Sequence, residues 1–158
     1  MADSTSKPRI ALGADHAGFR VKDTIKKYLE SAGYDVDDVG THSEESVDYP
    51  DFARAVAERV ASGNNPLGIV MCATGIGVAI TANKVAGIRA ALAHDSLTAR
   101  RAREHNDANV LALGGKVVGD DEAIAIVQEF LNAQFSGGRH QRRIDKITKM
   151  DQTREHKS

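Results

Sequence analysis

The chain has 158 residues, of which 41% are hydrophobic and 27% charged, and 21 basic side chains nearly balance 22 acidic ones. This length fits one ordinary α/β domain, and the composition excludes a disordered chain, a collagen-like fibre and a disulfide scaffold. The near-zero net charge argues against a protein dedicated to nucleic acid. With no apolar run near ~18 residues, a polar start and the single Cys72, we expect no membrane span, no secretory signal and a reducing, cytoplasmic location.

Apolar runs alternate along the chain with segments of helical periodicity. The runs predict strands at residues 9–14, 34–39, 67–72, 88–93 and 110–113. The periodic segments predict helices near 21–32, 50–60, 74–85, 96–105, 120–135 and 140–150. Such alternation is typical of right-handed βαβ units. We therefore predict an α/β fold: a doubly wound, five-stranded parallel sheet of the Rossmann or flavodoxin type, in the order 2-1-3-4-5, with a C-terminal helix.

The domain is predicted to span residues 9–150, between a flexible tail at 1–8 and a polar tail at 151–158. Charge is uneven, because residues 136–158 carry +4 and residues 1–135 carry −5. A basic segment of this kind either binds a small anion or solvates a helix face, and the solvated face is the default. Arg139 and Arg143 share one helical face, where two guanidiniums are well shaped to clamp a phosphate.

The predicted topology places a site between the first and third strands, where the winding of the sheet reverses. Two loops face this crevice, at residues 13–16 and 72–77. Small residues around Thr74 leave backbone N–H groups open to an anion or a developing oxyanion, although they equally suit a tight turn. A dinucleotide fingerprint is absent, because Ile80 stands where its third glycine belongs.

Cys72 and the pair Asp15-His16 end the two strands that flank the crevice. A lone buried cysteine is usually an inert small hydrophobe, yet a helix N-terminus stabilises a thiolate, which could act as nucleophile or as proton acceptor. A cysteine hydrolase therefore stays open. Asp15 is either a helix cap or one half of an acid/base pair with His16. No spacing of His and Cys suits zinc, so we predict no metal.

Several segments in combination resemble type B ribose-5-phosphate isomerase and the wider family that acts on galactose 6-phosphate and allose 6-phosphate. The resemblance runs in order from about Ile10 to Thr148. Its segments are Gly13-Ala14-Asp15-His16-Ala17-Gly18-Phe19, Asp48-Tyr49-Pro50, Cys72-Ala73-Thr74-Gly75-Ile76-Gly77, Ala82-Asn83-Lys84, Gly87-Ile88-Arg89, His105-Asn106-Asp107-Ala108-Asn109 and Gly137-Gly138-Arg139-His140. The chain departs from the family at Ala73, usually glycine, and at Lys116, where many relatives carry arginine.

The resemblance implies an aldose–ketose isomerase that interconverts ribose 5-phosphate and ribulose 5-phosphate in the pentose phosphate pathway, without metal or organic cofactor. It implies that Cys72 moves a proton between C2 and C1 through an enediolate. It implies that the enediolate is stabilised by Thr74 and by the amides of Ala73, Gly75, Ile76 and Gly77. It implies ring opening by His105 with Asp15, and contact of Asn106 with the sugar hydroxyls. The implied phosphate ligands are His16, Arg139 and Arg143, with Lys116 as a point charge.

His105 ends the fourth helix, so topology places it at the edge of the sheet opposite Cys72. We therefore expect it to complete the site of a second subunit, in a homodimer with sites at the interface. Pairing of dimers into tetramers stays open. Two other functions stay open as well: the same chemistry on a six-carbon sugar phosphate, and a non-catalytic nucleotide-binding module in which Asp95 meets a ribose.

Overall fold

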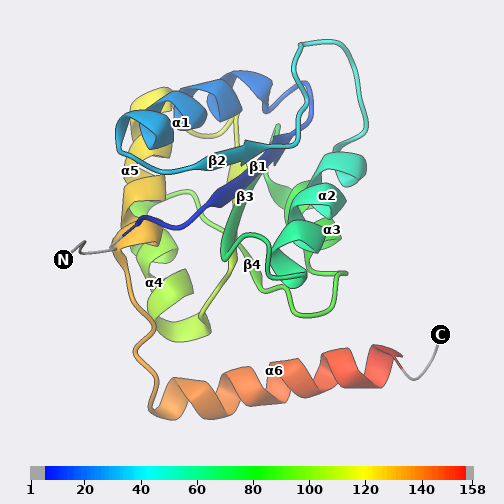
Figure 1. Ribbon diagram of the computed structural model, residues 1–158, viewed down its shortest axis with the longest axis vertical. Coiled ribbons are helices and arrows are strands. Elements are labelled where there is room, and N and C mark those ends of the chain that lie inside the picture. The colour runs from blue at the N-terminus through cyan, green and yellow to red at the C-terminus, as the bar shows by residue number, and fades with distance from the viewer. Residues whose placement is uncertain (1–5, 156–158) are drawn as a thin grey trace.

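A computed structural model describes residues 6–155, where a parallel β-sheet lies between two layers of helices (Figure 1). The strands and helices in chain order are β1 Ile10–Ala14, α1 Phe19–Ser31, β2 Val36–Asp38, α2 Tyr49–Ala61, β3 Leu67–Cys72, α3 Ile76–Ala82, β4 Ala90–Leu92, α4 Ser96–Asn106, β5 Val110–Gly114, α5 Asp120–Asn132 and α6 Arg139–Glu155. Every strand pair is parallel. The predicted fold class, a doubly wound five-stranded parallel sheet, is confirmed for the described residues.

The order of the last two strands differs from the predicted 2-1-3-4-5. The observed order is β2-β1-β3-β5-β4, so β5 pairs with β3 and β4 forms the edge. The reason is burial: every residue of β5 is buried, whereas β4 is short and partly exposed. The apolar strand takes the interior position, where helices cover both of its faces.

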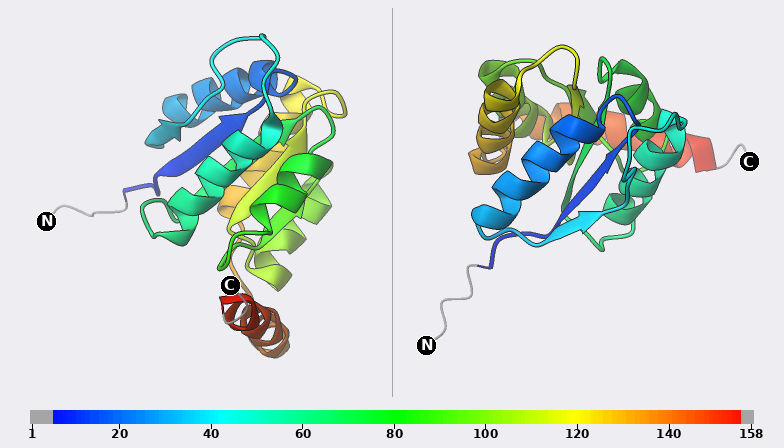
Figure 2. Two further views of the ribbon diagram at one scale, coloured as in Figure 1. Left: turned by 90° about the vertical axis from the view of Figure 1, so that its right-hand side faces the viewer. Right: turned by 90° about the horizontal axis from the view of Figure 1, so that it is seen from above.

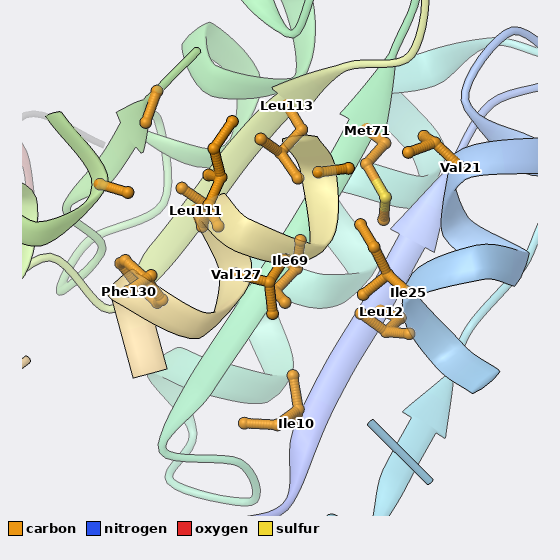
Figure 3. Packing of buried hydrophobic residues seen from close by; sticks show 14 of the residues in the cluster. Ile10, Leu12, Val21, Ile25, Ile69, Met71, Leu111, Leu113, Val127 and Phe130 are labelled. Atoms are coloured by element: carbon orange, nitrogen blue, oxygen red, sulfur yellow. The ribbon is translucent and has the colours of Figure 1, made fainter. Parts of the chain in front are cut away.

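The helices divide between the two faces of the sheet according to the direction of each crossover (Figure 2). Helices α1, α4 and α5 pack together on one face, and α2 and α3 pack together on the other. Figure 3 shows the larger core, in which Leu12, Ile69 and Leu111 of the sheet meet Val127 and Phe130 of α5. Because the chain leaves β3 toward one face and leaves β1 and β5 toward the other, the loop after Cys72 has a change of winding on both of its sides.

Helix α6 runs past the amino-end edge of the sheet, beneath the end of α4 (Figure 1). Ile144 anchors it in the core, Asp151 accepts a hydrogen bond from the Gly87 amide at 2.9 Å, and Ile147 and Met150 are exposed. The predicted helix at 140–150 is too short, so the predicted domain boundary at 150 falls inside α6. Of the two predicted tails, residues 1–5 and 156–158 lie outside the described part of the chain.

A buried ion pair joins α1 to the end of β2. Lys22 is only 1% exposed, and its Nζ lies 2.6 Å from Oδ2 of Asp38, whose side chain is 8% exposed. The Gly40 amide donates to Oδ1 of Asp38 at 2.9 Å. Burial alone raises the pKa of Asp38, but the hydrogen bonds from Lys22 and Gly40, with the charges of Lys22 and His42, lower it below its ordinary value.

Substitution Asp38→Asn should therefore lower the free energy of unfolding by roughly 3 kcal/mol at neutral pH, because it leaves the Lys22 ammonium buried without its charge partner. In the wild type this contribution is present above the unfolded pKa of about 4 and is lost as pH falls through the lower folded value. Urea unfolding at pH 7 and near pH 3 measures both effects. The control is Asp37→Asn, which breaks a 2.6 Å pair with the half-exposed Arg59 and should cost less than about 1 kcal/mol. Equal losses in the two variants would contradict this account.

Candidate active site

Cys72 ends β3 with its side chain 5% exposed, at the carboxyl edge of the sheet. Its Sγ accepts a hydrogen bond from the Gly75 amide at 3.2 Å. Gly75 has φ +80°, and a Cβ there would lie 2.8 Å from the carbonyl carbon of Leu113. The loop is therefore both a tight turn that needs glycine and a site that presents a backbone N–H group to the Cys72 sulfur.

The loop after Cys72 is held in place by hydrogen bonds to the segments that follow β5 and β4. The Gly115 amide donates to the Cys72 carbonyl at 2.8 Å, and the Lys116 amide donates to the Ala73 carbonyl at 3.0 Å. The backbone of Lys116 therefore lies beside this loop, and its predicted contact with the phosphate stays a prediction. His94, which sequence reasoning missed, has Nε2 3.2 Å from the Thr74 carbonyl oxygen. The signal that could have found His94 is its place just beyond the carboxyl end of a strand.

The Asp15-His16 loop lies beside the Cys72 loop, as predicted. The Asp15 amide donates to the Met71 carbonyl at 3.3 Å. Oδ1 of Asp15 accepts from the amides of Ala17 and Gly18 at 2.9 and 3.0 Å, so this carboxylate closes the turn into α1. The cap interpretation of Asp15 thus describes at least one of its two oxygens.

His16 is oriented by the loop between β2 and α2, which arches over the carboxyl edge of the sheet (Figure 1). Its Nδ1 accepts a hydrogen bond from the Val47 amide at 3.1 Å. When the ring is neutral its proton is therefore on Nε2, which is available to donate to an anion. The hydroxyl oxygen of Thr74 accepts from the Ile76 amide at 3.3 Å, and its own proton stays available in the same way.

Tyr49, the first residue of α2, forms one wall of the site. A Cβ on Gly77 would lie 2.6 Å from the Tyr49 ring, so the phenol packs directly against the start of α3. Sequence reasoning included Tyr49 only as part of a resembling segment. The contact joins the first turns of two helices that are far apart in the chain, and no local sequence pattern predicts it.

His105 and the arginines of α6 lie at the opposite edge of the sheet from Cys72. The His105 ring stacks on His140, with centroids 4.2 Å apart and an interplanar angle of 13°. Desolvation and then the positive charges around it, beginning with His105, lower the pKa of His140. Arg139 and Arg143 are exposed on the same helix. The structure thus gathers these basic groups at one place, with Asn106 beside them.

Within one chain, the length of β5 separates the two groups of candidate residues. Gly114 at the carboxyl end of β5 pairs with Cys72, whereas Val110 at its amino end pairs with Gly68. These pairs lie four residue steps apart along the strand, a distance of about 13 Å. The helix that ends in His105 and Asn106 enters β5 from the amino side. One subunit therefore does not bring His105 to its own Cys72.

Within residues 6–155, no cluster of three or more His, Cys, Asp or Glu side chains is placed to hold a metal ion. In the same part of the chain, no helix combines the length and apolarity needed to cross a membrane.

Comparison with known proteins identifies the family to which this arrangement of residues belongs. A family model described as ribose/galactose isomerase matches residues 10–147, which include both groups of candidate residues. The chain belongs to the ribose/galactose isomerase family. The predicted resemblance, and the interpretation of the chain as an aldose–ketose isomerase, are confirmed.

Members of this isomerase family match nearly the whole chain. Ribose-5-phosphate isomerase B of Escherichia coli is 48% identical over 146 residues, which cover 92% of this chain and 98% of the relative. The structure of ribose-5-phosphate isomerase B from Clostridium thermocellum has a TM-score of 0.91 at 53% identity, covering 92% of this chain and 98% of the other. The enzyme from Mycoplasma genitalium with bound ribulose-5-phosphate has a TM-score of 0.88 at 45% identity, covering 91% and 96%.

Proposed function

We propose that the chain interconverts ribose 5-phosphate and ribulose 5-phosphate, with Cys72 as the base that carries the proton between C2 and C1. The observation that carries this proposal is the Cys72 sulfur at the carboxyl edge of the sheet, within hydrogen-bond distance of the Gly75 amide, in a chain of this family. The substrate follows from the names of the similar proteins.

The reaction begins on the open-chain aldose. The Cys72 thiolate takes the C2 proton, the electron pair forms the C1–C2 double bond, and the aldehyde oxygen becomes an oxyanion. The thiol then returns the proton to C1, while the O2 proton passes to O1 and C2 becomes the ketone. The first N–H groups of α3 lack intrahelical acceptors and, with the Thr74 hydroxyl, stabilise the enediolate oxygens.

The assay is conversion of ribose 5-phosphate to ribulose 5-phosphate by the full chain in the presence of EDTA. Conversion supports the proposal, and its absence together with turnover of allose 6-phosphate or galactose 6-phosphate would assign the six-carbon alternative. The nucleotide-binding alternative depended on Asp95 as the residue that would meet a ribose. Asp95 caps α4, because its Oδ1 accepts from the Thr98 amide at 2.7 Å and from the Thr98 hydroxyl at 2.8 Å.

A second copy of the chain completes the site in this proposal. His105, Asn106, Arg139 and Arg143 lie at the wrong edge of the sheet for their own Cys72, so they serve a partner's crevice. Support comes from apolar side chains exposed beside the crevice: Ile76 and Ile80 on α3 are 52% and 57% exposed, next to Leu92 of the edge strand. Contiguous exposed apolar surface of this kind marks an interface. A two-fold dimer then contains two equivalent shared sites.

The roles of the remaining residues follow from that assembly. His105, stacked on His140, transfers protons at the ring oxygen to open the furanose, and Asp15 assists it from the partner's side. His16, Lys116 and the α6 arginines hold the phosphate, and Asn106 contacts the sugar hydroxyls. We place the enzyme in the cytoplasm and in the pentose phosphate pathway, in keeping with a single thiol that must stay reduced.

Substitutions Arg139→Ala and Arg143→Ala should each raise KM for ribose 5-phosphate about tenfold with little change in kcat, because a hydrogen bond to a charged group contributes roughly 1.5–3 kcal/mol. Steady-state kinetics and the inhibition constant of inorganic phosphate measure the effect. Lys149→Ala removes an exposed charge farther along α6 and is the control. An unchanged KM in both arginine variants would assign these side chains to a solvated helix face.

A further inference from the structure

Two arginines hold the turn that follows α4. Arg89, which precedes β4, donates from Nε to the Asn106 carbonyl at 3.0 Å and from Nη2 to the Asp107 carbonyl at 2.8 Å. Arg103, on α4 itself, donates from Nη1 to the Ala108 carbonyl at 2.6 Å. Guanidinium groups thus bind three successive carbonyl groups at the end of the helix. We call the side chains of Arg89 and Arg103 the arginine clamp.

The clamp includes more charge than the end of a helix requires. A helix commonly ends on one left-handed residue, usually glycine, whose backbone satisfies the last carbonyls. Here the left-handed residue is Asp107, with φ +45°, and its carboxylate lies 3.4 Å from Arg89 and 3.2 Å from Arg103. An aspartate in this conformation is strained, and the two arginines hold it there.

The clamp also places two like charges in a partly buried position. The side chains of Arg89 and Arg103 are only 21% and 18% exposed. Desolvation lowers the pKa of Arg103, the charge of Asp107 opposes this shift, and the charge of Arg89 adds to it. A second tie fixes the turn to β4, since the Arg89 amide donates to Oδ1 of Asn109 at 2.8 Å. Such an arrangement is costly for a plain helix cap, which indicates that the geometry of the turn matters for another reason.

We propose that Arg89 and Arg103 are positioning residues that fix His105 and Asn106 in the orientation required at the partner's active site. This inference rests on the proposed function, in which both residues are donated to a second subunit. The clamp binds the carbonyl of Asn106, the residue next to His105, while the His105 ring stacks on His140 of α6. The backbone and the ring of the donated segment are therefore held by separate elements.

The test is Arg89→Lys in the full chain. Lysine keeps the positive charge but offers a compact ammonium instead of a fork that spans two carbonyls. We expect kcat for ribose 5-phosphate to fall about 10- to 100-fold, since a small misplacement of a reacting group has effects of this size, with KM and the melting temperature little changed. The matched control is Arg59→Lys, which alters an arginine of α2, in the other helix layer, that pairs with Asp37 of β2. This variant should keep wild-type kcat.

A double-mutant cycle separates positioning from a merely structural role. If Arg89 acts through His105, adding Arg89→Lys to His105→Gln should lower kcat by less than about twofold further, whereas independent effects would multiply. The imidazole resonances of His105 and His140 should also shift in Arg89→Lys and not in Arg59→Lys, a readout that needs no substrate. Arg103→Lys, which retains the Arg89 fork, is the second variant if Arg89→Lys does not fold.

Three outcomes overturn the inference: multiplied losses in the cycle, wild-type kcat in Arg89→Lys, and unchanged imidazole resonances. A wild-type chain that does not isomerise ribose 5-phosphate contradicts the proposed function instead. These two failures are distinguished because the wild-type assay precedes any comparison of variants.

Discussion

Substitution Cys72→Ala should lower kcat for ribose 5-phosphate about 1,000-fold, because a positioned base contributes roughly two to four orders of magnitude to proton transfer. KM should change little, since in the proposed mechanism Cys72 contacts the reacting carbons and the phosphate is held elsewhere. The side chain is small and is the last of its strand, so the folded state should persist. Steady-state kinetics with matched circular dichroism spectra check both parts.

Cys72→Ser is the sharper variant. A serine hydroxyl can accept the same hydrogen bond from the Gly75 amide and nearly fills the same volume, but it ionises far above neutral pH. We expect the serine variant to be as inactive as the alanine variant and as stable as the wild type. Thr81→Ala, which removes a hydroxyl bonded to its own helix at Gly77, should retain full activity. Retention of more than about a tenth of wild-type kcat in either Cys72 variant would move the base to another residue.

The fold could be predicted from the sequence to the extent that burial leaves a local pattern. The apolar runs that end at Cys72 and Gly114 are strands buried on both faces, and both were predicted within a residue. The order of β4 and β5 could not be predicted, because it depends on which of two short segments buries more surface against the sheet. That comparison involves the whole molecule and has no periodic signature.

The candidate site also has parts that the sequence predicted and parts that it did not. Topology alone predicted that the loops at Asp15 and Cys72 lie together, since parallel strands end at the same edge of a sheet. Tyr49 was missed as a wall of the site, and so was His94 beside Thr74, because each contact joins segments distant in the chain. The sequence also left open whether Asp15 is a cap, and only the bonds to the Ala17 and Gly18 amides answer for Oδ1.

Substitution His105→Gln should lower kcat/KM for ribose 5-phosphate about 100-fold, the lower range for loss of a general acid–base group. Ribose 5-phosphate is chiefly a furanose, so a variant that cannot open the ring consumes only the free aldehyde present in solution. Its velocity should therefore stop rising as enzyme concentration increases, because spontaneous ring opening becomes limiting. The wild-type velocity should stay proportional to enzyme concentration, and proportionality in the variant would contradict the assigned role.

Mixing Cys72→Ala with His105→Gln decides whether the two residues meet across subunits. In a heterodimer with shared sites, one site contains both substitutions and the other contains none, so subunit exchange should restore about a quarter of wild-type activity. If Cys72 and His105 of one chain formed a site together, each site of the heterodimer would contain one substitution, and mixing would restore nothing. The position of His105 at the amino edge of the sheet, separated from Cys72 by the length of β5, requires the first result. The same mixture made with Arg89→Lys in place of His105→Gln should recover activity in the same way, because the clamp and the histidine are donated by one subunit.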